Sequence, residues 1–202
     1  MITRATLSSV NQGLPKYRSM LAGNTAYMPS GYFSIASATP TGTTTVTFSS
    51  IPQIYSTLII KSMCRDAYSG GVIAGTPIFL QVNGDSSSNY TYKGLYSEGS
   101  TLLGYGTSTT NNYITLDNGC ALGSCSAGVY GVSEIQIQDY AATDKFKPVR
   151  ANFGVNNNSL TANFEVGFVA GAWKSTSAIN SVTISTGYNF VAGTTISLYG
   201  LV

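Results

Sequence analysis

"SEIQIQDY", residues Ser133 to Tyr140, alternates apolar and polar side chains with a period of two. Ile135 and Ile137 share one face of this stretch, and glutamate and glutamine side chains occupy the other. Successive side chains of a β-strand point to opposite faces, so this pattern is typical of a half-buried strand. The stretch therefore predicts a strand with one core face and one polar face.

Seven other stretches show the same kind of pattern, and turn-forming residues separate them. They are TTTVTFSSI (43–51), YSTLIIKSMCR (55–65), PIFLQVNGD (77–85), NNYITL (111–116), ANFEVGFVAGAW (162–173), INSVTIST (179–186) and TISLYGLV (195–202). No stretch has the pattern of an amphipathic helix of three or more turns. The sequence predicts an all-β protein, an antiparallel two-sheet sandwich that is jelly-roll-like. An immunoglobulin-like sandwich is the alternative, but its Cys…Trp…Cys spacing is missing.

The stretch 162–173 is the most apolar of these candidates. We expect its core face to be formed by Phe164, Val166, Phe168, Ala170 and Ala172. Glu165 then belongs to a solvated face. Trp173 has the opposite parity to Phe168, so we expect it to face a loop or a neighbouring subunit.

Residues 1–33 differ from the rest because no period is sustained there and Pro15 and Pro29 interrupt them. We interpret 1–33 as an extended N-terminal arm and 34–202 as the sandwich domain. A disordered tail is the alternative, but disordered segments are poor in aromatic residues and this one is not. The residues expected to bind a partner are Leu14, Tyr17, Arg18, Met20, Leu21, Tyr27 and Tyr32.

Charge and hydrophobicity argue against several classes of protein. Charged residues make up 9% of the chain and the formal net charge is +2, whereas about 25% is usual. Without a cluster of lysines and arginines, nucleic-acid binding is not expected. No apolar run is long enough for a membrane span, and the N-terminus has no signal-peptide pattern. We therefore expect synthesis in a cytoplasm.

The side chains available for chemistry are few. The chain has no histidine and eight carboxylates, so histidine-based catalysis is excluded. A glycosidase needs only two carboxylates, and a depolymerase stays as a minor alternative. We expect no enzyme activity, no catalytic residues, no cofactor and no metal.

Two local features leave alternatives open. "NGDSSSNY", Asn83 to Tyr90, spaces oxygen-bearing side chains as a calcium loop does, but Asn-Gly more simply predicts a hairpin turn. Cys64 is expected in the core. Cys120 and Cys125 either bridge a loop or stay reduced, as a cytoplasm favours.

Three tyrosines at even spacing, Tyr90, Tyr92 and Tyr96, suit a surface that recognises sugar or protein. The alternative, which we favour, is that they form ordinary cross-strand pairs within a sheet.

Six segments occur in an order that resembles one family. They are MLAGNTAYMPSGYFSIAS, FSSIPQIYSTLIIKSMCRD, LQVNGDSSSNYTYKGLY, IQIQDYAATDKFKPVRA, GAWKSTSAINSVTI and NFVAGTTISLYG, spread from about Met20 to Gly200. This order is similar to that of small β-rich virion structural proteins of tailed bacteriophages, especially cyanophages and other aquatic phages.

The resemblance implies a virion component and supplies no catalytic residues. On this basis we expect a head decoration (cement) or fibre protein on the outside of the particle. Its expected partners are further copies of itself, as a homotrimer, and the major capsid protein or a tail or fibre protein. The alternative is a tail-fibre or receptor-binding module that adsorbs to host surface polysaccharide.

Overall fold

The computed structural model describes residues 31–70, 75–98, 100–107, 110–156 and 164–202. Twelve strands and no helix form in these ranges. The strands are β1 (Tyr32–Ala38), β2 (Thr45–Phe48), β3 (Thr57–Cys64), β4 (Gly75–Val82), β5 (Tyr90–Glu98), β6 (Thr101–Gly106), β7 (Ile114–Ala121), β8 (Gly131–Gln138), β9 (Lys147–Asn156), β10 (Phe164–Trp173), β11 (Val182–Thr186) and β12 (Thr195–Leu201).

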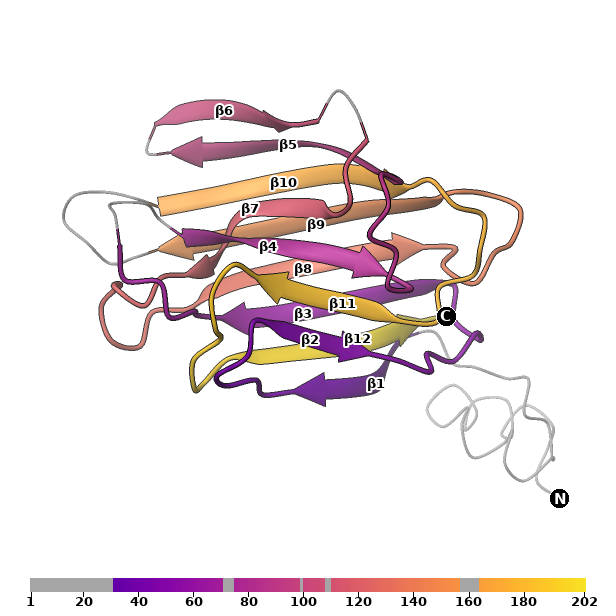
Figure 1. The fold of residues 1–202 in the computed structure, drawn as a ribbon, viewed down its shortest axis with the longest axis horizontal. Coiled ribbons are helices and arrows are strands. Elements are labelled where there is room, and N and C mark those ends of the chain that lie inside the picture. The colour runs from indigo at the N-terminus through magenta and orange to yellow at the C-terminus, as the bar shows by residue number, and fades with distance from the viewer. Residues whose placement is uncertain (1–30, 71–74, 99, 108–109, 157–163) are drawn as a thin grey trace, which may run out of the picture.

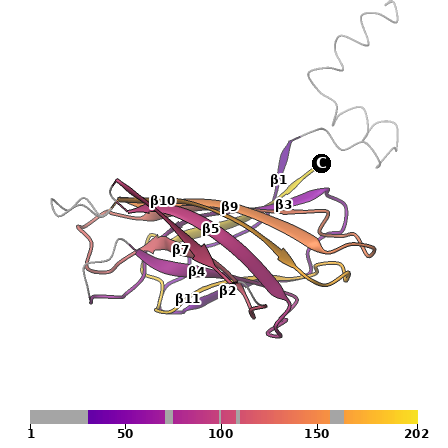
Figure 2. The ribbon, with the colours of Figure 1, turned by 90° about the horizontal axis from the view of Figure 1, so that it is seen from above.

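The strands form two antiparallel sheets that pack face to face (Figures 1 and 2). Sheet A has eight strands in the order β1-β12-β3-β8-β9-β10-β5-β6, and sheet B has four in the order β2-β11-β4-β7. The all-β, two-sheet prediction is therefore confirmed. All eight expected stretches contain strands, and β1, β5, β6 and β9 are additional.

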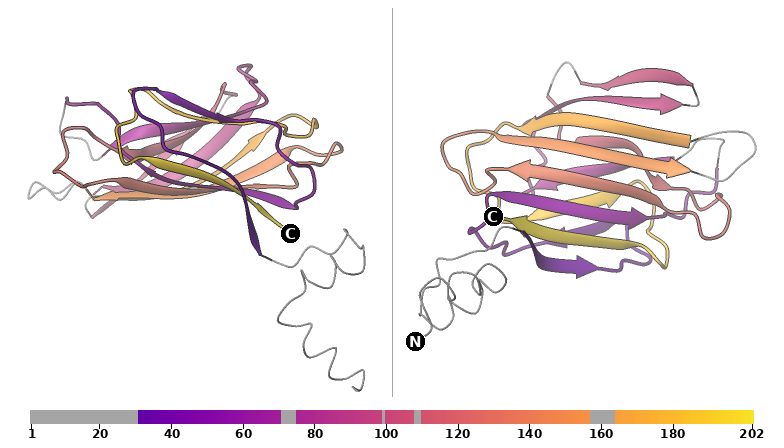
Figure 3. Two further views of the ribbon diagram at one scale, coloured as in Figure 1. Left: turned by 90° about the horizontal axis from the view of Figure 1, so that it is seen from below. Right: turned by 180° about the vertical axis from the view of Figure 1, so that it is seen from behind.

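Sheet A is wider than sheet B, so its β5–β6 end extends past the smaller sheet (Figure 1). Viewed from the other side, sheet A lies in front and no described strand covers its outer face (Figure 3, right). We call this side the outer face of sheet A.

The core lies between the sheets and is built from the alternating inward side chains of both. Leu58, Leu80 and Ile137 are fully buried in one continuous cluster. Such burial removes apolar surface from water and stabilises the fold by roughly 25 cal/mol per Å². The closing strand β12 belongs to this core through Ile196 and Leu198, both fully buried.

The turn after β4 has the geometry that the sequence predicted. Asn83 and Gly84 have φ angles of 53° and 64°, which suits the Asn-Gly pair of a two-residue turn. The Asp85 carboxylate accepts hydrogen bonds from the Trp173 indole Nε1 at 2.7 Å and the Asn89 side-chain amide at 2.9 Å. Protein donors thus hold this carboxylate. The turn itself is tight as predicted, but the prediction of a hairpin is wrong, because β4 and β5 belong to different sheets and do not pair.

Trp173 both joins the core and contacts this loop. Its side chain is 3% exposed and packs in the main cluster, while its indole N–H reaches Asp85. The expected loop contact is confirmed, but the expectation that Trp173 lies outside the core is wrong.

The three cysteines are free thiols. Cys64 is fully buried, as predicted, and Cys120 is buried beside it, whereas Cys125 is half-buried. The alternative of a Cys120–Cys125 bridge is therefore wrong for this structure.

Candidate functional site

The outward side of β10 is apolar, which reverses the expected orientation of this strand. Phe164, Val166 and Phe168 are 50%, 64% and 45% exposed. Glu165 and Val169 point inward, at 5% and 0% exposure. The prediction that Phe164, Val166, Phe168, Ala170 and Ala172 form the core face is wrong, and so is the prediction that Glu165 is solvated.

Two glycines explain this orientation. A Cβ on Gly167 would lie 2.1 Å from the ring of Phe153, which crosses the inner face of the strand there. A Cβ on Gly171 would lie 2.6 Å from the Thr91 carbonyl oxygen. Only glycine fits at such close approaches. Because side chains alternate along a strand, Gly167 and Gly171 direct Val166 and Phe168 to the outer face.

Glu165 is accommodated inside by polar contacts. Its carboxylate accepts a hydrogen bond from the Asn118 side-chain amide on β7 of the facing sheet. A buried carboxylate is costly unless it is hydrogen-bonded. The Asn118 contact therefore offsets part of the cost of this inward position.

Strand register aligns the exposed apolar side chains into rows. Met63 of β3 pairs with Val132 of β8, Val132 with Gly154 of β9, and Gly154 with Val166 of β10. In the adjacent row Phe168 pairs with Leu95 of β5. We define the apolar patch as the exposed side chains Met63, Leu95, Val132, Phe164, Val166 and Phe168.

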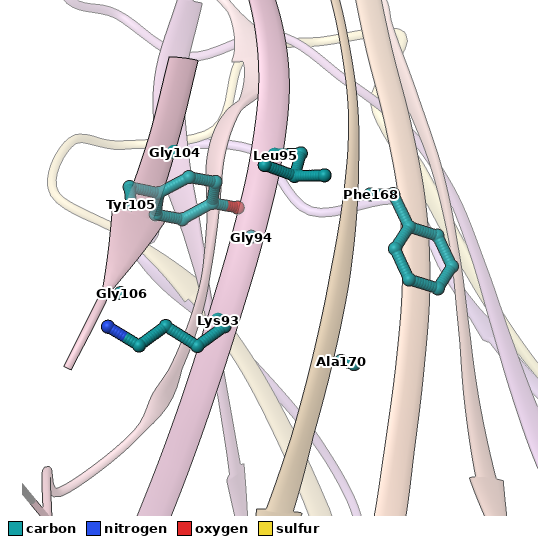
Figure 4. Close-up of a pocket in the computed structure, with 8 residues that line it drawn as sticks. All are labelled: Lys93, Gly94, Leu95, Gly104, Tyr105, Gly106, Phe168 and Ala170. Atoms are coloured by element: carbon teal, nitrogen blue, oxygen red, sulfur yellow. The ribbon is translucent and has the colours of Figure 1, made fainter. Parts of the chain in front are cut away.

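The patch contains three hollows where outward positions carry small residues. One of about 440 Å³ lies over Gly154 between Val132 and Val166, and one of about 600 Å³ adjoins it beside Phe164. A third, of about 480 Å³, lies over β5 and β6, where Leu95, Phe168 and glycines 104 and 106 are among the residues that line it (Figure 4). Exposed apolar side chains that alternate with shallow hollows make this face suitable for protein contact.

Polar groups border the patch on the β3–β8 side. Lys61 Nζ lies 3.2 Å from a Glu134 carboxylate oxygen, and Arg150 donates to the Gln136 side-chain oxygen at 2.6 Å. Partial burial acts to raise the pKa of Glu134, but hydrogen bonds from Gln136 and Lys61 outweigh it and hold the pKa below its ordinary value. Glu134 is thus a charged border residue.

Tyr32 brings the start of β1 to the same face. Its ring lies 4.8 Å from Lys61 Nζ and makes an edge contact with Tyr199 at 6.2 Å between ring centroids. Of the residues expected to bind a partner, Tyr32 is therefore on the outer face. The others, Leu14, Tyr17, Arg18, Met20, Leu21 and Tyr27, lie outside the described residues.

The tyrosines of β5 do not form a recognition surface. Tyr90 is fully buried and Tyr92 is 9% exposed, and Tyr96 packs edge-on against Tyr105. The interpretation of these residues as a recognition surface does not hold for Tyr90 and Tyr92, because they have the inward parity of β5 and are buried. The alternative of packing within the sheet accounts for them.

Two polar residues beside the β3–β4 connection have structural contacts. Asp66 accepts hydrogen bonds from Thr76 and from the Tyr68 backbone N–H, although burial raises its pKa. Arg65 donates to the carbonyl oxygens of Gly123 and Cys125 at 2.8 and 2.7 Å. These groups hold loops against the sandwich.

The described ranges contain neither a metal-ligand cluster nor a membrane-spanning helix. No three His, Cys, Asp or Glu side chains there gather as metal ligands would. No helix in those ranges has the length and apolarity of a membrane span. The patch is therefore the candidate site that the described structure offers. It was not apparent from the sequence, because alternation places Met63 and Val132 on outward faces but does not show that strand register aligns them with Val166. Comparisons with models of protein families, with curated proteins and with solved structures find no match to this chain.

Proposed function

We propose that this chain is a non-enzymatic structural protein on the exterior of a tailed-phage virion, as a head decoration (cement) or fibre component. It assembles through sandwich surfaces and an extended N-terminal arm. The observation that carries the proposal is the apolar patch, whose outward direction follows from Gly167 and Gly171.

The size of the patch supports a role in assembly. Its six side chains, each about half exposed, present on the order of 500 Å² of apolar surface, near the upper end of what monomeric proteins expose. A strand that points phenylalanine and valine outward while holding a glutamate inside is unfavourable for an isolated monomer. A covering partner removes that cost.

The strand order supports a jelly-roll assignment. We propose that β1-β12-β3-β8 and β2-β11-β4-β7 are its two four-stranded sheets, with β5–β6 and β9–β10 as hairpins that widen one of them. Jelly rolls recur in viral capsid and lectin domains. This analogy agrees with the resemblance to virion proteins, and it is an argument from fold alone.

The proposed partners are further copies of the chain, as a homotrimer, and the major capsid protein or a tail or fibre protein. Virion proteins occupy symmetry axes, which favours a closed ring of subunits. The alternative of adsorption to host glycan loses its main support because Tyr90 and Tyr92 are buried.

Copy number per particle tests the proposal. Purified virions are quantified by gel or mass spectrometry, and the chain is located by cryo-electron microscopy. A cement protein is expected in hundreds of copies, and a fibre protein in small multiples of three or six. Absence of the chain from purified particles would contradict the proposal.

A variant pair tests the role of the patch. Val166→Lys places a charge at its centre and is expected to reduce incorporation into particles at least tenfold. Thr45→Lys, on an exposed position of β2 in the other sheet, is the control and should incorporate normally. Equal incorporation of the two variants would exclude the patch as an assembly surface.

A further inference from the structure

We infer that the free edge of β6 is a strand-addition site, and that its occupant is the β6 of a second copy of this chain. The two β6 strands pair antiparallel about a two-fold axis at Gly104, which joins the A sheets of the two copies into one. The contact uses the edge of sheet A and leaves its outer face free. It therefore goes beyond the proposed function and does not depend on it.

The backbone of β6 presents hydrogen-bonding groups along its outer edge. β6 is the last strand of sheet A, and β5 is its one described neighbour in that sheet. The Thr107 N–H donates to the Tyr92 carbonyl oxygen at 3.1 Å, so every second residue back from position 107 directs its backbone groups toward β5. The residues between them, Leu102, Gly104 and Gly106, direct theirs away from β5. None of the three is a proline, so each presents a donor and an acceptor.

The other three edges of the described sheets are less suited to pairing. The β1–β12 ladder has a register shift between Ser34 and Ala36, and the β4–β7 ladder has one between Thr76 and Ile78. β2 has only four residues. Bulges and short edge strands protect a sheet from pairing with another chain. β6 reads TLLGYG and pairs with β5 without a register shift, so it has no bulge, proline or charged side chain to protect it.

The space beside this edge is open to a second strand. Sheet B ends at β7, and β5 and β6 extend past it (Figure 1). On the outer face of β6, Leu102 is 70% exposed. Glycines 104 and 106 are among the residues that line the hollow of about 480 Å³ (Figure 4). The edge therefore carries one large apolar side chain beside two positions that have none.

A second copy of β6 complements this edge. With the two-fold axis at Gly104, Leu102 of each copy lies opposite Gly106 of the other copy. All three outward-directed residues of each strand then form hydrogen-bonded pairs, whereas a shift by two residues leaves only two such pairs within β6. The Leu102 side chain covers the space that Gly106 leaves open. A surface that complements itself in this way is typical of a two-fold contact, which favours a second copy over an unrelated strand.

The same register keeps like charges apart. Lys93 of β5 pairs with Gly106, and its side chain runs beside that glycine (Figure 4). In the two-fold pair the two Lys93 residues lie at opposite ends of the contact, roughly 14 Å apart along the strands and roughly 14 Å across them. Their separation of about 20 Å exceeds the screening length of about 8 Å in physiological salt. Lys93 therefore does not oppose the pairing.

Analytical ultracentrifugation of the full chain tests the inference with a pair of charge variants. A Cβ at Gly104 would have its nearest neighbour at 3.8 Å, so the subunit accepts a side chain there. Gly104→Lys and Gly104→Glu each place like charges opposite one another at the axis, and each should weaken pairing at least about tenfold. An equimolar mixture of the two variants should pair again, because opposite charges then meet. Thr45→Lys, on an exposed position of β2, is the control and should pair as the parent does.

Val166→Lys separates this contact from the outer face of sheet A. Val166 lies on β10, two strands from β6, so this variant should keep the concentration-dependent pairing that Gly104→Lys loses. Pairing that survives Gly104→Lys would overturn the inference, as would a mixture of the Lys and Glu variants that does not pair. A parent protein that stays monomeric up to about 100 μM, a concentration that reveals even weak contacts, would overturn it too. Because no particles are used, failure here is distinct from failure of the proposed virion role.

Discussion

Gly167 lies against the ring of Phe153 on the inner face of sheet A, so closely that a Cβ would be 2.1 Å from the ring. This contact between neighbouring strands determines which side of β10 faces water. It therefore links core packing to the surface that the protein presents.

Gly167→Ala should destabilise the fold by about 1–3 kcal/mol, the usual cost of overpacking a core. Chemical denaturation measures the free energy of unfolding. Phe153→Ala alone should also lower the free energy of unfolding. The double variant should lose less than the sum of the two single losses, because the ring that meets the added Cβ at position 167 is no longer present. Strict additivity would show that the two residues do not interact.

Val166→Ser and Val169→Ser form a matched pair three residues apart on β10. Val169 is fully buried, so placing a hydroxyl there should cost about 2–4 kcal/mol in unfolding free energy. Val166 is exposed, and its variant should lose less than about 1 kcal/mol. Circular dichroism in urea measures both, and similar losses would contradict the orientation of β10.

Asp85→Asn tests the loop contact to Trp173 through pH. Partial burial acts to raise the pKa of Asp85, but hydrogen bonds from Asn89, Trp173 and Ser87 outweigh it and lower the pKa from 3.8 to about 2. The folded-state pKa is depressed, so this carboxylate stabilises the fold fully above about pH 4. That contribution is lost as pH falls toward about 2.

We expect Asp85→Asn to lose about 1 kcal/mol at pH 7 and to depend less on pH between 4 and 2 than the parent. Thermal unfolding at each pH measures this. Asp139→Asn is the control, because the Asp139 carboxylate forms an exposed ion pair with Lys145 at 3.3 Å, which contributes little. An unchanged pH profile for Asp85→Asn would refute the assignment.

Thiol labelling tests the cysteine environments. Cys125 is half-buried, whereas Cys64 and Cys120 are buried. Hydrogen bonding with Cys64, together with burial, raises the pKa of the Cys120 thiol, and thiols react as thiolates. Mass spectrometry after alkylation should show Cys125 labelled first in native protein and all three labelled in denaturant. Rapid native labelling of Cys120 would contradict the structure.

The sequence predicts the strands better than it predicts their faces. Alternation in residues 133–140 gives β8 and the inward side chains of Ile135 and Ile137. On β10 both parities contain apolar residues, and the choice between them depends on Phe153, which becomes a neighbour only through strand pairing. The relevant sequence feature is the pair Gly167 and Gly171. This pair indicates the orientation of β10 only when the pairing of β9 with β10 is known.

The additional strands have weak local patterns for similar reasons. β9 begins with Lys147 and Pro148, and β6 reads TLLGYG with two glycines. Charge, proline and glycine all lower strand propensity. Pairing with β8, β10 and β5 stabilises these segments. The apolar patch crosses five adjacent strands, from β3 to β5, so its existence depends on tertiary register that a single sequence does not contain.

The positions of β11 and β12 have a consequence for biosynthesis. β12 lies between β1 and β3, and β11 lies between β2 and β4. β2 cannot join the rest of sheet B until the ribosome has made the chain through Thr186, and β1 cannot join the rest of sheet A until the chain is made through Leu201. Contacts between such distant segments slow folding. β1 and β2 therefore stay unpaired until late in translation. We expect that chaperone protection during translation raises the yield of folded protein.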